Sequence, residues 1–359
     1  MSLRLVIKST IPLTFFGYAA FANLALFTSN VEKPVPDTVM NGAFTSEIDS
    51  LYRTNLPHRE PAVGLVGALR YLTLNEGRTG VVAGDNGWLF TDEEFRDQDI
   101  AIQGLPETLD WIMTVQQDLE MYGTELVLVP IPAKIEFSQT SGYANQITEI
   151  AATYDTFVAS TVQAGIKTVD TRSALASTEL AFFQTDTHWT TEGAAAVAES
   201  VSQSGLIAPG SDTFERVALA PLSFEGDLVS FVTSEKLAPI IGLPAETVAP
   251  YVANPLSTDA QSGSIDLFGF DAAAPSVLVG TSYSANPNWS FIEALKLALS
   301  QDIVNYAQEG RGPIAPMHEY LDAFDPADAP PVVIWEFPVR YLSDPSLKDA
   351  LNNNGDENA

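Results

Sequence analysis

The stretch Pro275-Ser-Val-Leu-Val-Gly-Thr-Ser282 decides which fold class we expect for this chain. A short apolar run between a proline and a glycine is typical of a buried strand. In α/β proteins the carboxyl edge of the sheet is where functional groups are usually presented. We therefore expect Ser282 to stand at such an edge, directly after a buried strand.

Other segments of the chain alternate between strand and helix patterns in the same way. Short apolar runs occur at residues 126–129, 167–170, 303–306 and 332–336, and helical periodicity occurs at 105–122, 145–164 and 290–300. This alternation predicts a largely parallel sheet covered by helices on both faces. Residues 44–74 predict two helices, and the Asp-Asn-Gly turn within residues 81–90 predicts a hairpin.

A second motif, Asp186-Thr-His188-Trp189, places a carboxylate two residues from an imidazole. Thr190 or Thr191 can cap the helix that follows, so the motif is expected on a short, rigid turn. An imidazole held by a carboxylate is what a general base needs to deprotonate a hydroxyl nucleophile. Alone, the motif also fits a surface hydrogen bond or half a metal site, but the other two histidines lie in no matching context. Together with Ser282 it favours a serine hydrolase or acyltransferase.

Composition excludes several classes of protein. The chain has 359 residues, of which 46% are apolar, and this is enough for a substantial core. It has no cysteine, which rules out disulfides, thiolate zinc sites and cysteine nucleophiles. Seventeen basic residues against 46 acidic ones give a net charge of −29, which repels phosphate backbones, so nucleic acid is not an expected partner.

The N-terminal segment predicts export. Arg4 and Lys8 precede the mostly apolar residues 11–27, as in a signal anchor or a signal peptide, and we favour the uncleaved anchor. The expected location is the periplasm, on the inner membrane. The expected divisions are a signal segment at 1–29, a linker at 30–43, one catalytic domain at 44–342 and a C-terminal tail at 343–359. Within that tail, residues 351–359 are expected to be frayed.

The motifs carry a family resemblance over about residues 44 to 342. Their order resembles that of the AlgJ/AlgX family of polysaccharide O-acetylation proteins, whose domain is similar to SGNH hydrolases. The motifs are Gly87-Trp-Leu-Phe90, Pro130-Ile-Pro-Ala-Lys134, Asp186-Thr-His188-Trp189, Gly226-Asp-Leu228, Gly280-Thr-Ser282 and Trp335-Glu336. The resemblance implies a flavodoxin-like three-layer α/β/α sandwich, in which Asp-x-His precedes the serine.

The resemblance also implies residue roles. Ser282 is expected to be the nucleophile, His188 the base and Asp186 its orienting carboxylate. Position in the chain, rather than the resemblance, adds three candidates for oxyanion or substrate contacts: Lys134, which could also be a solvated loop lysine, and Asn286 and Asn288, which could also be turn formers. Neither a metal nor a cofactor is expected.

The implied function is O-acetylation of an exported polysaccharide, such as alginate, with the acetyl donor delivered by a multi-spanning membrane acetyltransferase. Two alternatives remain: an SGNH-type carbohydrate esterase, and a non-catalytic scaffold of a polysaccharide-export complex. The net charge, taken by itself, predicts a neutral or weakly charged acceptor, because a polyanion would meet a repulsive field.

Overall fold

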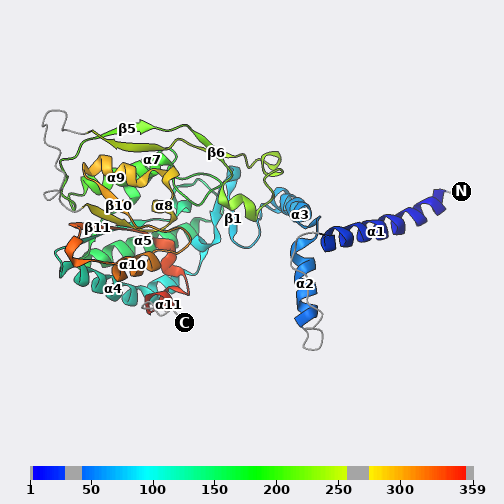
Figure 1. Cartoon of the computed structure of the whole chain (residues 1–359), viewed down its shortest axis with the longest axis horizontal. Coiled ribbons are helices and arrows are strands. Elements are labelled where there is room, and N and C mark those ends of the chain that lie inside the picture. The colour runs from blue at the N-terminus through cyan, green and yellow to red at the C-terminus, as the bar shows by residue number, and fades with distance from the viewer. Residues whose placement is uncertain (1–2, 29–42, 257–274, 353–359) are drawn as a thin grey trace.

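Five strands form one parallel sheet at the centre of the molecule, in the order β10-β9-β11-β3-β4 (Figure 1). The computed structural model describes residues 3–28, 43–256 and 275–352. The strands are β3 (Glu125–Ile131), β4 (Lys167–Thr168), β9 (Ser276–Val279), β10 (Ile303–Asn305) and β11 (Val332–Pro338). All four pairings are parallel, which confirms the predicted sheet.

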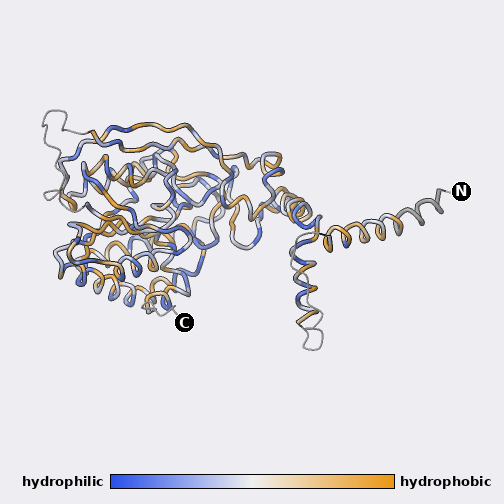
Figure 2. Tube along the Cα trace, viewed as in Figure 1, coloured by the Kyte–Doolittle hydropathy of each residue, from blue (hydrophilic) through white to orange (hydrophobic). Residues whose placement is uncertain are grey.

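The strands are apolar on both faces because helices cover both. On β3, Val127 and Val129 belong to the core on one face, and Leu126 and Leu128 belong to the core on the other. Figure 2 shows hydrophobic segments running through the sheet between the helical layers. Continuous burial of this kind is expected of a parallel sheet enclosed between two layers.

The two helical layers confirm the predicted three-layer sandwich (Figure 1). One core contains residues of α6 (Arg172–Ala176), α7 (Thr191–Gln203) and α9 (Phe291–Leu299). The opposite core contains residues of α4 (Gln98–Glu120), α5 (Ala144–Gln163), α10 (Ile314–Asp322) and α11 (Leu347–Asn352). Leu347 and Leu351 of α11 are buried in this second core, so the frayed segment does not begin at Leu351 as predicted; residues 353–359 lie outside the described residues.

The order of the strands explains why the Asp-x-His motif precedes the serine. If β9 is counted as the first strand, β10 is the second, β11 the third, β3 the fourth and β4 the fifth. With this numbering the order of strands across the sheet is 2-1-3-4-5. That is the flavodoxin order. The flavodoxin-like prediction therefore holds for the sheet, with the chain entering it at a different strand.

Three antiparallel pairs lie outside this sheet. The predicted hairpin is present: β1 (Val81–Ala83) pairs with β2 (Leu89–Thr91), and Asn86 and Gly87 in the turn have φ of 57° and 83°. Residues 214–255, in which the sequence analysis predicted no strands, form the other two pairs. These are β5 (Phe214–Ala218) with β8 (Tyr251–Pro255), and β6 (Leu222–Phe224) with β7 (Glu246–Val248).

Short 3-10 turns complete the fold. They are η2 (Asp85–Gly87), η3 (Asp92–Phe95), η4 (Lys134–Phe137), η5 (Asp227–Phe231), η6 (Ala238–Ile241), η7 (Pro287–Trp289), η8 (Pro326–Asp328) and η9 (Val339–Ser343).

The N-terminal part contributes α1 (Leu3–Thr28), α2 (Ala43–Asn55) and α3 (Arg59–Leu74), which confirms the two helices predicted within residues 44–74. In Figure 1, α1 and α2 project away from the sandwich, and α3 leads back to it. Within the described ranges, no helix has both the length and the apolarity needed to cross a membrane. The membrane or signal segment at 1–29 is thus not confirmed, and the linker at 30–43 falls almost wholly outside the described residues.

Candidate active site

Ser282 stands where the sequence places it, three residues beyond β9, as the first residue of the short helix α8 (Ser282–Ala285). The Thr281 side chain caps this helix by accepting the N–H of Tyr283. Gly280 is required before it, because a Cβ there would lie 2.5 Å from an Oε2 atom of Glu336. The serine is therefore presented on a tight turn between strand and helix, at the carboxyl edge of the sheet.

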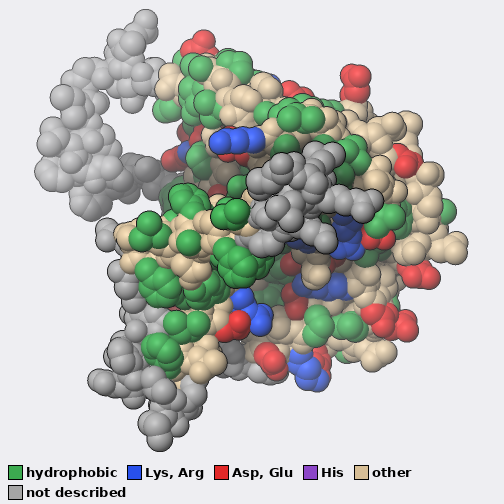
Figure 3. Space-filling model, turned by 90° about the vertical axis from the view of Figure 1, so that its right-hand side faces the viewer, with side chains coloured by type: hydrophobic (Ala, Val, Ile, Leu, Met, Phe, Trp, Pro, Cys, Tyr) green, Lys and Arg blue, Asp and Glu red, His purple; other side chains and the backbone are tan. Residues whose placement is uncertain are grey.

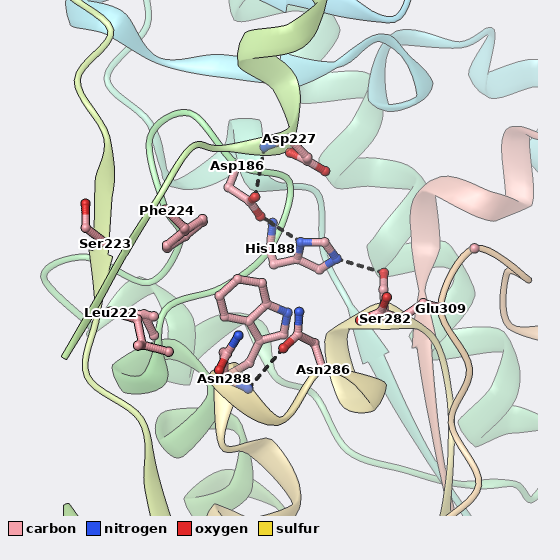
Figure 4. Close-up of a pocket in the computed structure, with 13 residues that line it drawn as sticks. Asp186, His188, Leu222, Ser223, Phe224, Asp227, Ser282, Asn286, Asn288 and Glu309 are labelled. Carbon is pink, nitrogen blue, oxygen red and sulfur yellow. Dashed lines mark hydrogen bonds and ion pairs between the residues drawn. The ribbon is translucent and has the colours of Figure 1, made fainter. Parts of the chain in front are cut away.

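Ser282, His188 and Asp186 form one connected chain of hydrogen bonds (Figure 4). The Ser282 Oγ atom lies 2.7 Å from His188 Nε2, and His188 Nδ1 lies 2.7 Å from Asp186 Oδ1. The serine and the histidine are 94 residues apart in the sequence. A base within hydrogen-bonding distance of the nucleophile, itself held by a carboxylate, is the arrangement of a Ser-His-Asp triad.

Asp186 is well suited to orient the imidazole. Its Oδ1 also accepts the backbone N–H of His188 at 2.9 Å, and its Oδ2 accepts the N–H of Asp227 at 3.0 Å. Burial acts to raise the pKa of Asp186, but the hydrogen bond and charge of His188 and the two N–H donors outweigh it and lower that pKa. Asp186 is thus held as a carboxylate, which favours an N–H on Nδ1 and leaves Nε2 to accept the serine proton.

Aromatic side chains fix the plane of the His188 ring. Trp289 stacks on it with centroids 5.2 Å apart and planes 25° apart, and Tyr283 meets it edge to face at 5.0 Å. Thr190 caps α7 by accepting the N–H of Gly193 at 3.1 Å, as one of the two predicted caps. The imidazole is therefore held by packing as well as by Asp186.

The turn Gly226-Asp227 belongs to one of the motifs singled out in the sequence, but its role in the site was not predicted. Besides donating its N–H to Asp186, Asp227 accepts the N–H of Thr187 at 2.8 Å through Oδ1. A Cβ on Gly226 would lie 2.3 Å from the carbonyl oxygen of Thr185, so only glycine allows the two turns to meet this closely. The glycine-containing turn was visible in the sequence, but its partner was not.

Asp186, His188 and Asp227 also place potential ligand atoms within 4.8 Å of one another. The hydrogen bonds of this group argue for a triad rather than for a metal centre. Both Asp186 oxygens accept N–H groups, and both nitrogens of His188 are engaged with Asp186 and Ser282.

Lys134, a predicted candidate for oxyanion or substrate contacts, is buried instead. The side chain is 1% exposed, and Nζ donates to the carbonyl oxygens of Leu89 at 2.6 Å, Gln184 at 3.0 Å and Asp186 at 2.8 Å. These three bonds use all the donors of an ammonium group. Lys134 instead fastens the turn that carries Asp186 to the β2 strand.

Asn286 and Asn288 do lie beside the triad, where Figure 4 shows them below His188. The Oδ1 atom of Asn286 accepts the N–H of Asn288 at 3.0 Å and thereby caps η7. Asn286 is thus a turn former, as asparagine often is, and its side-chain amide group also borders the cavity.

The triad opens onto a cavity of about 720 Å³. Its walls come from the triad, from the β6–β7 pair, from the turn after Ser282 and from one further loop. The lining residues are Asp186, His188, Leu222, Ser223, Phe224, Asp227, Val248, Ser282, Asn286, Asn288, Trp289, Glu309 and Gly310. A second cavity of about 300 Å³ also reaches Ser282 and His188, and it includes Arg96 and Arg340. The reacting atoms are therefore open to ligands from two directions.

Comparison with known proteins identifies the family. The family model described as "SGNH hydrolase-like domain, acetyltransferase AlgX" matches residues 81–339. The probable alginate O-acetylase AlgJ of Pseudomonas syringae pv. tomato is 37% identical over 325 residues, covering 88% of this chain and 82% of the relative. The corresponding protein of Pseudomonas aeruginosa is 36% identical over 364 residues, covering 94% and 93%.

Solved structures agree with this result. The O-acetyltransferase domain of Pseudomonas putida AlgJ superposes with a TM-score of 0.61 at 32% identity, over 76% of this chain and 99% of that one. Pseudomonas aeruginosa AlgX, at 23% identity, shares the fold with a TM-score of 0.55, over 74% of this chain and 67% of that one. Because the model spans most of the chain and the relatives exceed 30% identity, the chain belongs to the AlgX family of SGNH hydrolase-like acetyltransferases.

Proposed function

We propose that this protein transfers acetyl groups to hydroxyls of alginate through a covalent acetyl-enzyme on Ser282. The observation that carries the proposal is the unbroken connection from Ser282 Oγ through His188 to Asp186, with both contacts at 2.7 Å, at the edge of a cavity large enough for sugar residues. The relatives named as alginate O-acetylases support the acceptor.

The first half of the reaction loads the enzyme. Ser282 Oγ attacks the acetyl carbonyl carbon of the donor while His188 Nε2 takes the serine proton. The backbone N–H of Ser282 is the first of α8, so the helix offers it no acceptor, and it can donate to the oxyanion that forms. When the intermediate collapses, the bond to the donor breaks, the leaving group takes the proton from His188, and the acetyl group stays on Ser282.

The second half of the reaction transfers the acetyl group from Ser282 to the acceptor. A sugar hydroxyl attacks the acetyl carbon of the acetyl-enzyme, and His188 accepts the hydroxyl proton. Collapse of this intermediate breaks the bond to Ser282 Oγ, which recovers its proton from His188. An esterase would complete the same sequence with water in place of the sugar, so the geometry of the triad is common to both activities and the acceptor distinguishes them.

The net charge of −29 does not decide the acceptor. Charges more than about 10 Å away are largely screened at physiological ionic strength. A bound sugar is affected mainly by the side chains that line the cavity around it. In the larger cavity these include the apolar side chains of Leu222, Phe224 and Trp289. We therefore propose alginate as the acceptor, in place of the neutral polysaccharide that the total charge predicted.

The test is incubation of the protein with an activated acetyl ester and mannuronate oligomers. We expect acetyl groups on the oligomers and, with the acceptor left out, a peptide containing Ser282 that is heavier by one acetyl group. Ser282→Ala is expected to lose both, while Ser177→Ala, at an exposed serine, keeps both. Free acetate without acetylated sugar would assign an esterase, and an unlabelled, inactive wild type would assign a scaffold.

We also propose that the domain works in the periplasm and receives acetyl groups from a multi-spanning membrane acetyltransferase. Arg4 and Lys8 ahead of the apolar residues 11–27 support attachment to the inner membrane through the N-terminal segment. Cell fractionation of the full chain and of a chain whose residues 1–29 are replaced by a cleavable signal peptide tests this, because both proteins are then exported. Equal release of both into the soluble periplasmic fraction would contradict attachment.

A further inference from the structure

Helix α3 packs with its small residues inward. Gly64, Gly67 and Ala68 are buried against the η5–η6 region, and a Cβ on Gly67 would lie 2.0 Å from the carbonyl oxygen of Val232. Close approach of the helix backbone explains these small side chains. The bulky side chains of α3 must therefore point elsewhere.

The opposite face of α3 carries those bulky apolar side chains, and they are exposed. The exposed fractions are 54% for Leu65, 65% for Val66, 54% for Leu69 and 62% for Leu72. Their spacing places them along one stripe of the helix. A surface helix normally buries such a stripe, and a contiguous exposed one marks an interaction surface.

This face continues into other exposed apolar surface. The middle of α1 contacts the start of α3, where the rings of Tyr18 and His58 lie 5.2 Å apart. Ile240, in the neighbouring η6, is 77% exposed. In Figure 3, viewed from the side on which α1 projects, hydrophobic side chains gather on this face. From residue 13 onward, the exposed large apolar side chains of α1 are Leu13, Phe15, Phe16, Tyr18, Phe21, Leu24 and Phe27.

Charge distinguishes this part of the chain from the rest. Residues 1–80 contain seven Lys or Arg and six Asp or Glu. Residues 81–359 contain ten Lys or Arg and forty Asp or Glu. An anionic bilayer repels the acidic remainder but not the nearly neutral first 80 residues. Among the surfaces of this protein, the one formed by α1, α3 and Ile240 combines exposed apolar side chains with a charge that allows close approach to lipid.

We propose that the outer face of α3, defined by Leu65, Val66, Leu69 and Leu72, lies in the interfacial region of a lipid bilayer as a second membrane contact beside α1. A helix with a wide apolar stripe and polar ends is bound at such an interface by burial of that stripe. Arg59 and Arg70 are exposed on α3 and form ion pairs with Glu60 and Glu76, so charged pairs lie at both ends of the apolar stripe. The inference rests on the proposed attachment to the inner membrane and is independent of the acetyl-transfer chemistry.

The absence of cysteine from the sequence makes a local test possible. Single cysteines are introduced in the full chain at Leu69, at Phe16 of α1 and at Ile102 of α4, and each is labelled with an environment-sensitive fluorophore. Ile102 is 44% exposed and serves as the matched control away from α3. The proteins are bound to vesicles of phosphatidylethanolamine and phosphatidylglycerol, with or without brominated acyl chains.

We expect brominated lipid to quench the probes at Leu69 and Phe16 by about half or more and to leave the Ile102 probe unchanged, because only groups within the bilayer meet bromine. Quenching at Phe16 without quenching at Leu69 would overturn the proposal. So would a Leu69 probe that becomes shielded only when a membrane protein copurifies, because that outcome assigns the face to a protein partner. Quenching is read without any turnover, so the result stands apart from that of the acetyl-transfer assay.

Discussion

Glu336 on β11 accepts the backbone N–H of Thr281 at 2.7 Å and so ties the residue before the nucleophile to the neighbouring strand. Its carboxylate also accepts the hydroxyl of Thr281 at 3.0 Å and that of Ser284 at 3.0 Å. Glu336 is fully buried, and burial raises its pKa. A buried carboxylate with these contacts acts as a positioning residue for the turn that carries Ser282.

Replacing Glu336 with glutamine is expected to lower kcat about 10- to 100-fold with little change in KM, because an amide NH₂ cannot accept the donors that a carboxylate oxygen accepts. Thr281→Ser, which keeps a hydroxyl, serves as the milder partner variant. The measurement is steady-state turnover of an acetyl ester, with thermal unfolding as a check on folding. Unchanged kcat in the folded Glu336→Gln protein would remove Glu336 from the positioning role.

The triad variants Ser282→Ala, His188→Ala and Asp186→Asn are each expected to reduce turnover by about 10³-fold or more, since the three act as a unit. A variant that combines two of these substitutions should lose little more turnover than either single variant. Turnover of the purified variants tests this, with Ser177→Ala as the control. Additive losses in the double variants would show that the residues act separately.

Lys134→Met is expected to lower the free energy of unfolding by about 2–4 kcal/mol, because three carbonyl oxygens lose a buried ammonium donor. Burial lowers the pKa of Lys134 to about 8, so this charge is kept in the fold at a cost. Lys236→Met, at an exposed lysine, provides the control. Urea unfolding gives both values, and equal stability of the two variants would contradict the structural role of Lys134.

Glu136 supplies a pH-dependent prediction. Its side chain is 7% exposed, and burial raises its pKa from 4.5 to about 7, although Arg172 lies 3.0 Å away. As the pH rises from 4.5 to about 7, the unfolded chain gives up this proton before the folded one, so the contribution of Glu136 to stability is lost across that window. Glutamine does not titrate, and Glu136→Gln should therefore gain stability relative to the wild type over the same range.

Unfolding in urea at several pH values between 4.5 and 8 measures this difference. The exposed Glu179→Gln variant is the control, and it should run parallel to the wild type. A Glu136→Gln curve that also runs parallel to the wild type would show that burial does not shift this pKa.

The sequence by itself determined the five strands of the central sheet, the β1–β2 hairpin, most of the helices and the pair Asp186 and His188. These features are local: apolar runs and helical periodicity are set by neighbouring residues, and a carboxylate two positions from an imidazole needs only one turn to reach it. The position of Ser282 was also predictable from the sequence, because the buried strand before it ends at the edge of the sheet where the cavity opens.

The tertiary structure alone decided how these parts are arranged and supported. Asp227, Lys134 and Glu336 reach their partners across 41, 52 and 55 residues of chain. The order of strands in the sheet and the place of β6 and β7 over the cavity are equally nonlocal. Periodicity reports only which face of an element is apolar, not which element will cover it. Pairing between distant segments is fixed by the fit of buried side chains and by the need to satisfy every buried polar group, and both become defined only when the chain is folded.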